Sequence, residues 1–182
     1  MPRYRRANAE GATYFFTVVS YRRQAILCDE PIRTILRQAI KQVQGLHPFT
    51  IDAWVLLPDH LHCIWTLPES DSDFATRWAM IKRKVSLACA SQYKREDWIT
   101  PSKRKHREST IWQRRYWEHQ IRDEGDFMRH ADYIHYNPVK HCLCERAALW
   151  PYSTFSRYVK QGIYPVDWGA ADTRLEEGTF GE

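Results

Sequence analysis

The sequence has no long apolar run and no paired-cysteine motif, and each absence excludes a class of protein. A membrane-spanning helix needs roughly 18 or more apolar residues in succession, and no segment of the 182 residues supplies them. The basic N-terminus, residues 1–6, is not followed by the apolar core of a signal peptide. We therefore expect a cytoplasmic protein with no membrane partner.

Cysteine is too scarce and too irregularly spaced for a covalent framework. The number of cysteines is odd and none form a CxxC pair, so neither a disulfide scaffold nor a zinc knuckle is predicted; they are Cys28, Cys63, Cys89, Cys142 and Cys144. The 43% of apolar residues is enough to bury a core without cross-links. We expect one domain over residues 1–150 and a C-terminal extension over residues 151–182.

Acidic residues are outnumbered in most of the chain. The net charge is +5, yet residues 165–182 carry five acidic side chains against Arg174 alone, a net of −4, so residues 1–164 carry +9. Such an excess attracts polyanions, of which nucleic acid is the commonest in the cytoplasm. The acidic segment 165–182 has two interpretations: it folds over a basic DNA groove and partly inhibits the protein, or it is a solubilising tail.

The first half of the chain alternates strand and helix patterns. Residues 13–19 are β-branched and aromatic, which predicts a strand, and apolar residues at helical spacing over 32–43 predict a helix. Two further strand-like runs, 50–57 and 60–67, are separated by the turn dipeptide Pro58-Asp59. This arrangement predicts a β-hairpin.

The next segment combines a helix with a basic region. Apolar residues over 74–90 predict a second helix, with Asp71 or Asp73 as its N-terminal cap. Residues 93–108 are rich in lysine and arginine and have few apolar anchors, which predicts a mobile loop that is either a solvated surface or a DNA contact.

A fourth strand is expected over residues 111–119, and a helix over 123–136 that ends at Asn137 because Pro138 follows. The order βαββαβ is that of split βαβ, ferredoxin-like folds. We therefore predict an α+β fold with a ferredoxin-like antiparallel sheet, helices on one face, and an added C-terminal helix and tail.

His60 and His62 are two residues apart on a predicted strand, so both imidazoles leave the same face of the sheet. Neutral imidazoles bind divalent metals, and two of them leave positions open for a substrate oxygen. A His-x-His pattern on a strand is more often structural. Here, however, the preceding turn puts both histidines where a strand begins and a site can open.

Tyr133 and Asn137 are four residues apart on a predicted helix and therefore share a face. This places a possible nucleophile beside a possible carbonyl-oxygen ligand. The residues alone leave other interpretations open: Tyr133 as a core aromatic, Asn137 as a helix stop, and Tyr136 as the nucleophile.

Three motifs then stand in order along the chain: Leu57–Trp65 (LPDHLHCIW), Trp112–His119 (WQRRYWEH) and Asp132–His141 (DYIHYNPVKH). With them the chain resembles the REP-associated tyrosine transposases over nearly its whole length, through Trp150–Phe155, and the basic segment 93–108 resembles a length-variable region. Those proteins are relatives of single-tyrosine HUH transposases. They are associated with repetitive extragenic palindromes (REPs), which form hairpins in single-stranded DNA.

The resemblance implies a metal-dependent endonuclease and strand transferase that acts on REP hairpins through a covalent 5′-phosphotyrosine intermediate. It makes Tyr133 the nucleophile and His60, His62 and Asn137 the metal ligands, with Mg²⁺ or Mn²⁺ as the ion. The partner is then single-stranded or hairpin DNA and the location is the nucleoid. The oligomeric state stays open, with a monomer favoured.

Phosphate and base contacts have several candidates. Aromatic stacking on unpaired bases falls to Trp112, Tyr116 and Trp117, and phosphate binding to a basic set, namely Lys82, Arg83, Lys84, Arg114, Arg115 and Lys140. Two rival functions remain. One is a catalytically silent hairpin-binding protein of transposase origin, and the other is a hydrolase in which His60, His62 and Asp59 bind zinc.

Overall fold

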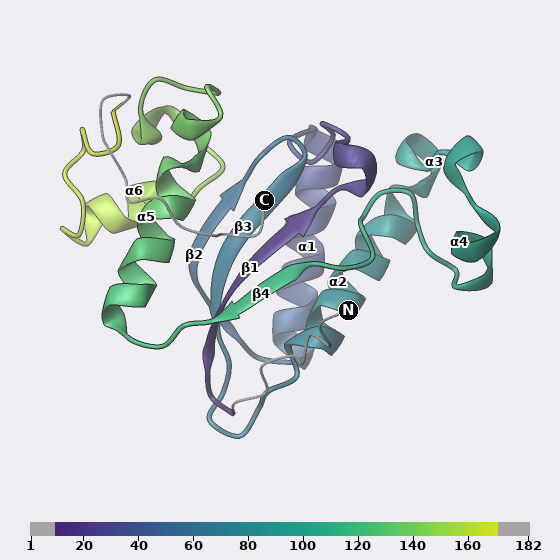
Figure 1. Cartoon of the computed structure of the whole chain (residues 1–182), viewed down its shortest axis with the longest axis horizontal. Coiled ribbons are helices and arrows are strands. Elements are labelled where there is room, and N and C mark those ends of the chain that lie inside the picture. The colour runs from purple at the N-terminus through teal and green to yellow at the C-terminus, as the bar shows by residue number, and fades with distance from the viewer. Residues whose placement is uncertain (1–9, 171–182) are drawn as a thin grey trace, which may run out of the picture.

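Four strands pair into one antiparallel sheet in the order β2-β3-β1-β4 (Figure 1). They are β1 (Thr13–Val19), β2 (Thr50–Leu56), β3 (His60–Thr66) and β4 (Trp117–Gln120) in a computed structural model that describes residues 10–170. Strand β3 lies between β1 and β2, and β1 lies between β3 and β4. This is the split βαβ arrangement, so the predicted α+β fold with an antiparallel sheet is confirmed.

Helices cover both faces of the sheet. Helices α1 (Glu30–Leu46) and α2 (Phe74–Ala88) pack on one face, where alternate residues of β1 such as Tyr14 and Phe16 are buried. Helix α5 (Glu124–Lys140) packs on the other, over Phe15. None of the helices within residues 10–170 has the length and apolar composition needed to cross a bilayer.

The start of α2 distinguishes the two cap candidates. The Asp73 carboxylate accepts a hydrogen bond from the Thr76 backbone N–H at 2.9 Å, as an N-cap does. Asp71 binds the buried Arg77 guanidinium instead, at 2.6 Å. Asp73 is therefore the cap, and Asp71 neutralises a charge that the same helix buries.

Two predictions on the segment before β4 are wrong. Residues 93–108, expected as a mobile loop, follow the short helix α3 (Ala90–Tyr93) and contain a 3₁₀ turn, η2 (Glu96–Trp98), and the short helix α4 (Pro101–Lys105). The buried Lys103 anchors this segment, because its ammonium lies 3.8 Å from the centroid of the Tyr21 ring.

The fourth strand also begins later than residue 111, at Trp117, because Trp112 is drawn into the core beneath α1 and α2. On the way the chain crosses the end of β1, where the Gln113 N–H bonds the Val19 carbonyl at 3.0 Å.

Helix α5 continues through Pro138 to Lys140, so the predicted end at Asn137 is wrong. Proline cannot donate to the carbonyl one turn earlier, but Pro138 is buried, and the final turn is closed by the His141 N–H on the Asn137 carbonyl at 3.0 Å. The extra turn brings Lys140 and His141 onto the helix face that looks toward the sheet's histidines.

The chain after α5 packs back onto the same face of the sheet. It forms η3 (Ala147–Leu149) and α6 (Phe155–Lys160), and the rings of Phe155, Tyr164 and Trp168 stack beside α5. A domain division at residue 150 stays a prediction. Residues 171–182, which carry most of the acidic segment, lie outside the described residues, so its two interpretations are left as they stand.

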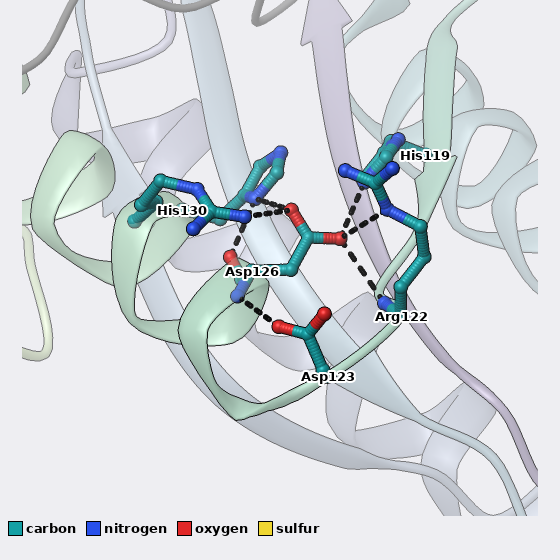
Figure 2. Close-up of polar contacts among 6 residues, drawn as sticks. His119, Arg122, Asp123, Asp126 and His130 are labelled. Atoms are coloured by element: carbon teal, nitrogen blue, oxygen red, sulfur yellow. Dashed lines mark hydrogen bonds and ion pairs between the residues drawn. The ribbon is translucent and has the colours of Figure 1, made fainter.

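Asp126, in the first turn of α5, joins this helix to β4 (Figure 2). Its side chain is buried, and one carboxylate oxygen accepts from His119 Nε2 at 2.9 Å and from the Arg122 backbone N–H at 3.0 Å. The guanidiniums of Arg122 and Arg129 add ion pairs at 3.3 and 3.4 Å. Because His119 belongs to β4, the carboxylate fixes where the helix begins relative to the sheet.

The hydrogen bonds of Asp126 also establish which imidazole nitrogens carry protons. Burial alone would raise the pKa of Asp126, but the hydrogen bonds from His119 and Arg122 hold it well below its usual range. An ionised carboxylate only accepts, so His119 Nε2 carries a proton. The Asp126 carbonyl, 2.8 Å from His130 Nδ1, likewise makes that nitrogen a donor, and burial lowers the pKa of His130.

Asp126→Asn removes the charge at nearly constant volume, so we expect the free energy of unfolding at pH 7 to fall by roughly 1.5–3 kcal/mol. Because the folded-state pKa is lowered, this contribution is present above the ordinary value of 3.8 and is lost as the pH falls below it. Urea denaturation of wild type and variant should therefore converge on acidification. Asp123→Asn keeps an N-cap and is the control, with less than about 0.5 kcal/mol expected; a pH-independent gap would contradict this account.

Candidate functional site

His60 and His62 lie at the beginning of β3 on the face that α5 covers. The sheet register pairs His60 with Val19 and His62 with Thr17. Both imidazoles are buried, and their ring centroids are 4.9 Å apart. The two-residue spacing thus brings them together, as predicted for a pleated strand.

The neighbours of the two rings hold their Nδ1 atoms. Asp59 Oδ1 lies 2.7 Å from His60 Nδ1, and Thr17 Oγ1 lies 2.8 Å from His62 Nδ1. Partial burial would raise the pKa of Asp59, but the hydrogen bond from His60 and the neighbouring Arg23 guanidinium lower it to about 2. The ionised carboxylate only accepts, so the His60 proton sits on Nδ1 and the lone pair on Nε2.

A stripe of α5 faces this pair. Tyr133, Asn137 and His141 follow one another at four-residue intervals, which puts them on one side of a helix. The Tyr133 ring lies 5.1 Å from the His62 ring, and the His141 ring 5.2 Å from the His60 ring. Asn137 is fully buried between these two contacts, so the stripe runs along the histidine pair.

Lys140 places a cation at the Tyr133 hydroxyl. Its ammonium nitrogen donates to the phenolic oxygen at 3.2 Å and lies 4.8 Å from the ring centroid. Tyr136, the alternative nucleophile, lies toward Trp168 instead, with 6.5 Å between ring centroids. Of the two tyrosines, the structure therefore puts Tyr133 beside the histidines.

Two histidine clusters lie on this face, and they offer different atoms. Ligand atoms of His119, Asp126 and His130 are within 4.8 Å of one another, the spacing of a metal site. Yet both imidazole nitrogens there donate N–H protons, two guanidiniums hold the carboxylate, and the rings stack at 14°, so their in-plane lone pairs do not converge. We interpret this cluster as the anchor of α5.

The donor set of the other cluster fits a divalent metal. His60 offers the Nε2 lone pair, His62 faces the same side of the strand, and Asn137 adds an amide carbonyl from the helix. Imidazole and amide oxygen are ligands that Mn²⁺ and Mg²⁺ accept. Asp59 is engaged with Nδ1 and with Arg23 at 3.1 Å, away from Nε2, so it orients His60 and does not complete a zinc site.

The basic turn of α2 lies on the opposite face of the sheet from the histidines. Lys82 donates to the Gln113 carbonyl at 2.9 Å and Lys84 to the Gln42 side chain at 3.0 Å, while Arg83 is exposed. The structure thus does not bring the predicted cations Lys82–Lys84 together with His60 and His62.

The segment before β4 divides in the same way. Arg114 and Arg115 are exposed, and Arg114 pairs with Glu108 at 3.4 Å. Trp112 is buried, so little of its ring is open to a base, and the half-buried Tyr116 packs on the Trp78 side of the sheet. Trp117 is half-buried on the α5 face.

Sequence reasoning missed two neighbours of the site, His141 and Thr17. His141 was missed because the helix was expected to end at Asn137, although the spacing 133–137–141 was visible. Thr17 belongs to no motif, and its place follows only from the register that pairs it with His62.

Comparison with known proteins identifies the family. The model "Transposase IS200 like" matches residues 9–137, more than half of the chain. The REP-associated tyrosine transposase of Escherichia coli K12 is 43% identical over 178 residues, which cover 98% of this chain and 97% of that one. A solved structure of a REP-associated tyrosine transposase bound to a REP hairpin aligns over 100% of this chain and 98% of that chain, with a TM-score of 0.82 and 42% identity. The chain therefore belongs to the REP-associated tyrosine transposases, within the IS200-like transposase family.

Proposed function

We propose that this protein is a metal-dependent endonuclease and strand transferase that cuts single-stranded DNA beside a REP-type hairpin, with Tyr133 as nucleophile. The observation that carries the proposal is the convergence of the Tyr133 ring, the two imidazoles and the Lys140 ammonium on one face of the sheet. The relative seen with a REP hairpin supports the choice of substrate.

The reaction exchanges one phosphodiester for another. The Tyr133 oxygen attacks a backbone phosphorus, the bond from phosphorus to the 3′ oxygen breaks, and that oxygen takes a proton to leave as a 3′-OH. The 5′ phosphate stays on the tyrosine. Attack by a 3′-OH on this phosphotyrosine restores a phosphodiester and releases the phenol, so joining needs no ATP.

The site's own residues prepare the nucleophile and the ligand set. As the phenol loses its proton, the hydrogen bond from the Lys140 ammonium comes to join two opposite charges and therefore becomes stronger. Asp59 and Thr17 orient the two imidazoles through their Nδ1 atoms. When bound by His60, His62 and Asn137, Mg²⁺ or Mn²⁺ stabilises the charge that develops on a phosphoryl oxygen.

A protein that only binds hairpins is the second candidate. It would use the cationic surface but would need neither the Tyr133–Lys140 contact nor the Asp59–His60 pair. Both are present in the structure, and this favours the enzyme.

Asp59→Ala removes the acceptor that holds the His60 proton on Nδ1, so we expect Mn²⁺ affinity to fall roughly 10- to 100-fold. Isothermal titration of the DNA-free protein measures this directly. Arg23→Gln is the matched control, because it removes the partner of Asp59 but leaves the Asp59–His60 hydrogen bond. Unchanged Mn²⁺ affinity of the Asp59 variant would contradict the ligand role of His60.

Tyr133→Phe removes one hydroxyl and keeps the ring that packs near His62 and Phe15. We expect normal folding and hairpin binding but complete loss of the covalent protein–DNA adduct on a denaturing gel. Tyr136→Phe is the control and should form the adduct at the wild-type rate. Adduct formation by the Tyr133 variant would move the nucleophile elsewhere.

Lys140→Met removes the cation at the phenolic oxygen, and we expect cleavage in single turnover to slow by roughly 10- to 100-fold. Lys140→Arg keeps a donor and a charge and should recover much of the rate. Hairpin affinity, measured separately without metal, should change far less than the rate. Equal losses in binding and cleavage would make Lys140 a phosphate contact only.

A further inference from the structure

A groove lies beside the free edge of β2, between α1, β2 and residues 151–154. Its volume is about 330 Å³. Three cations from α1 line it, Arg33, Arg37 and Lys41, and among the lining residues that the structure describes there is no aspartate or glutamate. The groove is therefore concave, and all of its charged lining residues are cations.

The spacing of the cations follows the helix. Residues four apart on α1 share a face and advance by about 6 Å, a step comparable to that between successive phosphates of an extended single strand. Arg37 and Lys41 are exposed. A row of this kind tracks a phosphate backbone along one side of a groove.

The opposite wall and the floor are aromatic and apolar. Trp54 and Tyr152 line the groove and are half-buried, so part of each ring is open to it. The Arg33 guanidinium lies 4.4 Å from the Tyr152 ring centroid. Aromatic faces beside a cationic row are what unpaired bases stack on.

The groove is built on fixed backbone and lies on the α1 face of the sheet, opposite the face that carries the histidines. Residues 152–154 run along the free edge of β2, where Leu56 N–H bonds the Tyr152 carbonyl at 2.8 Å and Thr154 N–H bonds the Trp54 carbonyl at 2.9 Å. Leu56, at the end of the groove, pairs with Leu61, the neighbour of His60. The groove thus ends at the same end of the sheet as the proposed cleavage site.

We propose that this groove binds the single-stranded DNA that flanks the hairpin, with phosphates on Arg37 and Lys41 and bases on Trp54 and Tyr152. The inference deepens the proposed function, because it gives the unpaired strand a path that is separate from the residues that cut it. The volume is too small for a duplex.

The test compares one hairpin with and without a short single-stranded flank by fluorescence anisotropy, using the full chain. Arg37→Gln with Lys41→Gln should weaken binding of the flanked hairpin by roughly 10-fold and lower its salt slope by about 1.4, since each single-strand phosphate contact contributes about 0.7. Binding of the flankless hairpin should change less than about 2-fold. Arg146→Gln with Lys160→Gln removes the same charge from exposed positions outside the groove and is the matched control.

Equal losses on both DNAs, or no loss on either, would overturn the proposal. A second result would also overturn the proposal: polyglutamate, an acidic peptide, binds the wild type but not the groove variant, while the single-stranded flank still strengthens hairpin binding by that variant. Photo-cross-linking from 5-iododeoxyuridine in the flank should map to the peptides that contain Trp54 or Tyr152, and cross-links confined to α5 would place the strand elsewhere. The adduct assay is run separately on the wild type. If the wild type forms no adduct but the groove variant still loses the effect of the flank on binding, the enzyme proposal fails and the groove proposal stands.

Discussion

The placement of α5 against the open face of the sheet is the constraint on which the site depends. A helix turns by about 100° and rises about 1.5 Å per residue, so a slip of one residue would carry the Tyr133 ring away from His62. The packing that prevents the slip is local and dense: Phe15 lies 4.7 Å from the His130 ring and 6.3 Å from the Tyr133 ring, measured between centroids. Phe15 therefore sits under two successive turns of the helix.

The two ends of α5 are held in different ways. At its beginning, the buried Asp126 carboxylate ties the helix to β4, a strand of four residues that pairs with β1. A buried charge with all its partners in place rigidifies a structure, and the same charge is costly once a partner is lost. At its end, ring contacts bring His141 to His60. The helix is thus fixed in direction at one end by ionic bonds and in rotation at the other by packing.

Most of the sheet was predictable because its strands are rich in β-branched and aromatic residues and are bounded by turn residues. The composition of Thr13–Val19 predicted a strand, Pro58-Asp59 predicted a turn, and the two-residue period of a strand put His60 and His62 on one face. The structure places all three as predicted. The roles of Tyr133 and Asn137 came from family motifs, since their spacing alone allowed a core aromatic and a helix stop. They remain a proposal that the geometry supports.

The errors have a common physical origin, in that tertiary packing outweighed a local signal. Pro138 would end an isolated helix, but here the residue is buried, and burial offsets one missing hydrogen bond. Trp112 belongs to a strand-like run, but its ring is buried in the core under α2, and the strand therefore begins only at Trp117. Lys103 looks like a solvated charge, yet it lies on the Tyr21 ring. A local sequence pattern does not predict contacts between residues so distant in sequence.

The order of the site along the chain has a consequence for incomplete molecules. The histidine pair lies on β3, whereas the tyrosine and its lysine lie on α5, and the strand between them in sequence, β4, supplies the anchor of that helix. A nascent chain, or a fragment left by proteolysis between these elements, holds the two imidazoles without a nucleophile or the tyrosine without its imidazoles. Under the proposed function, the capacity to cut DNA arises only when translation has passed α5, so that unfinished copies of the protein pose no hazard to the genome that encodes them.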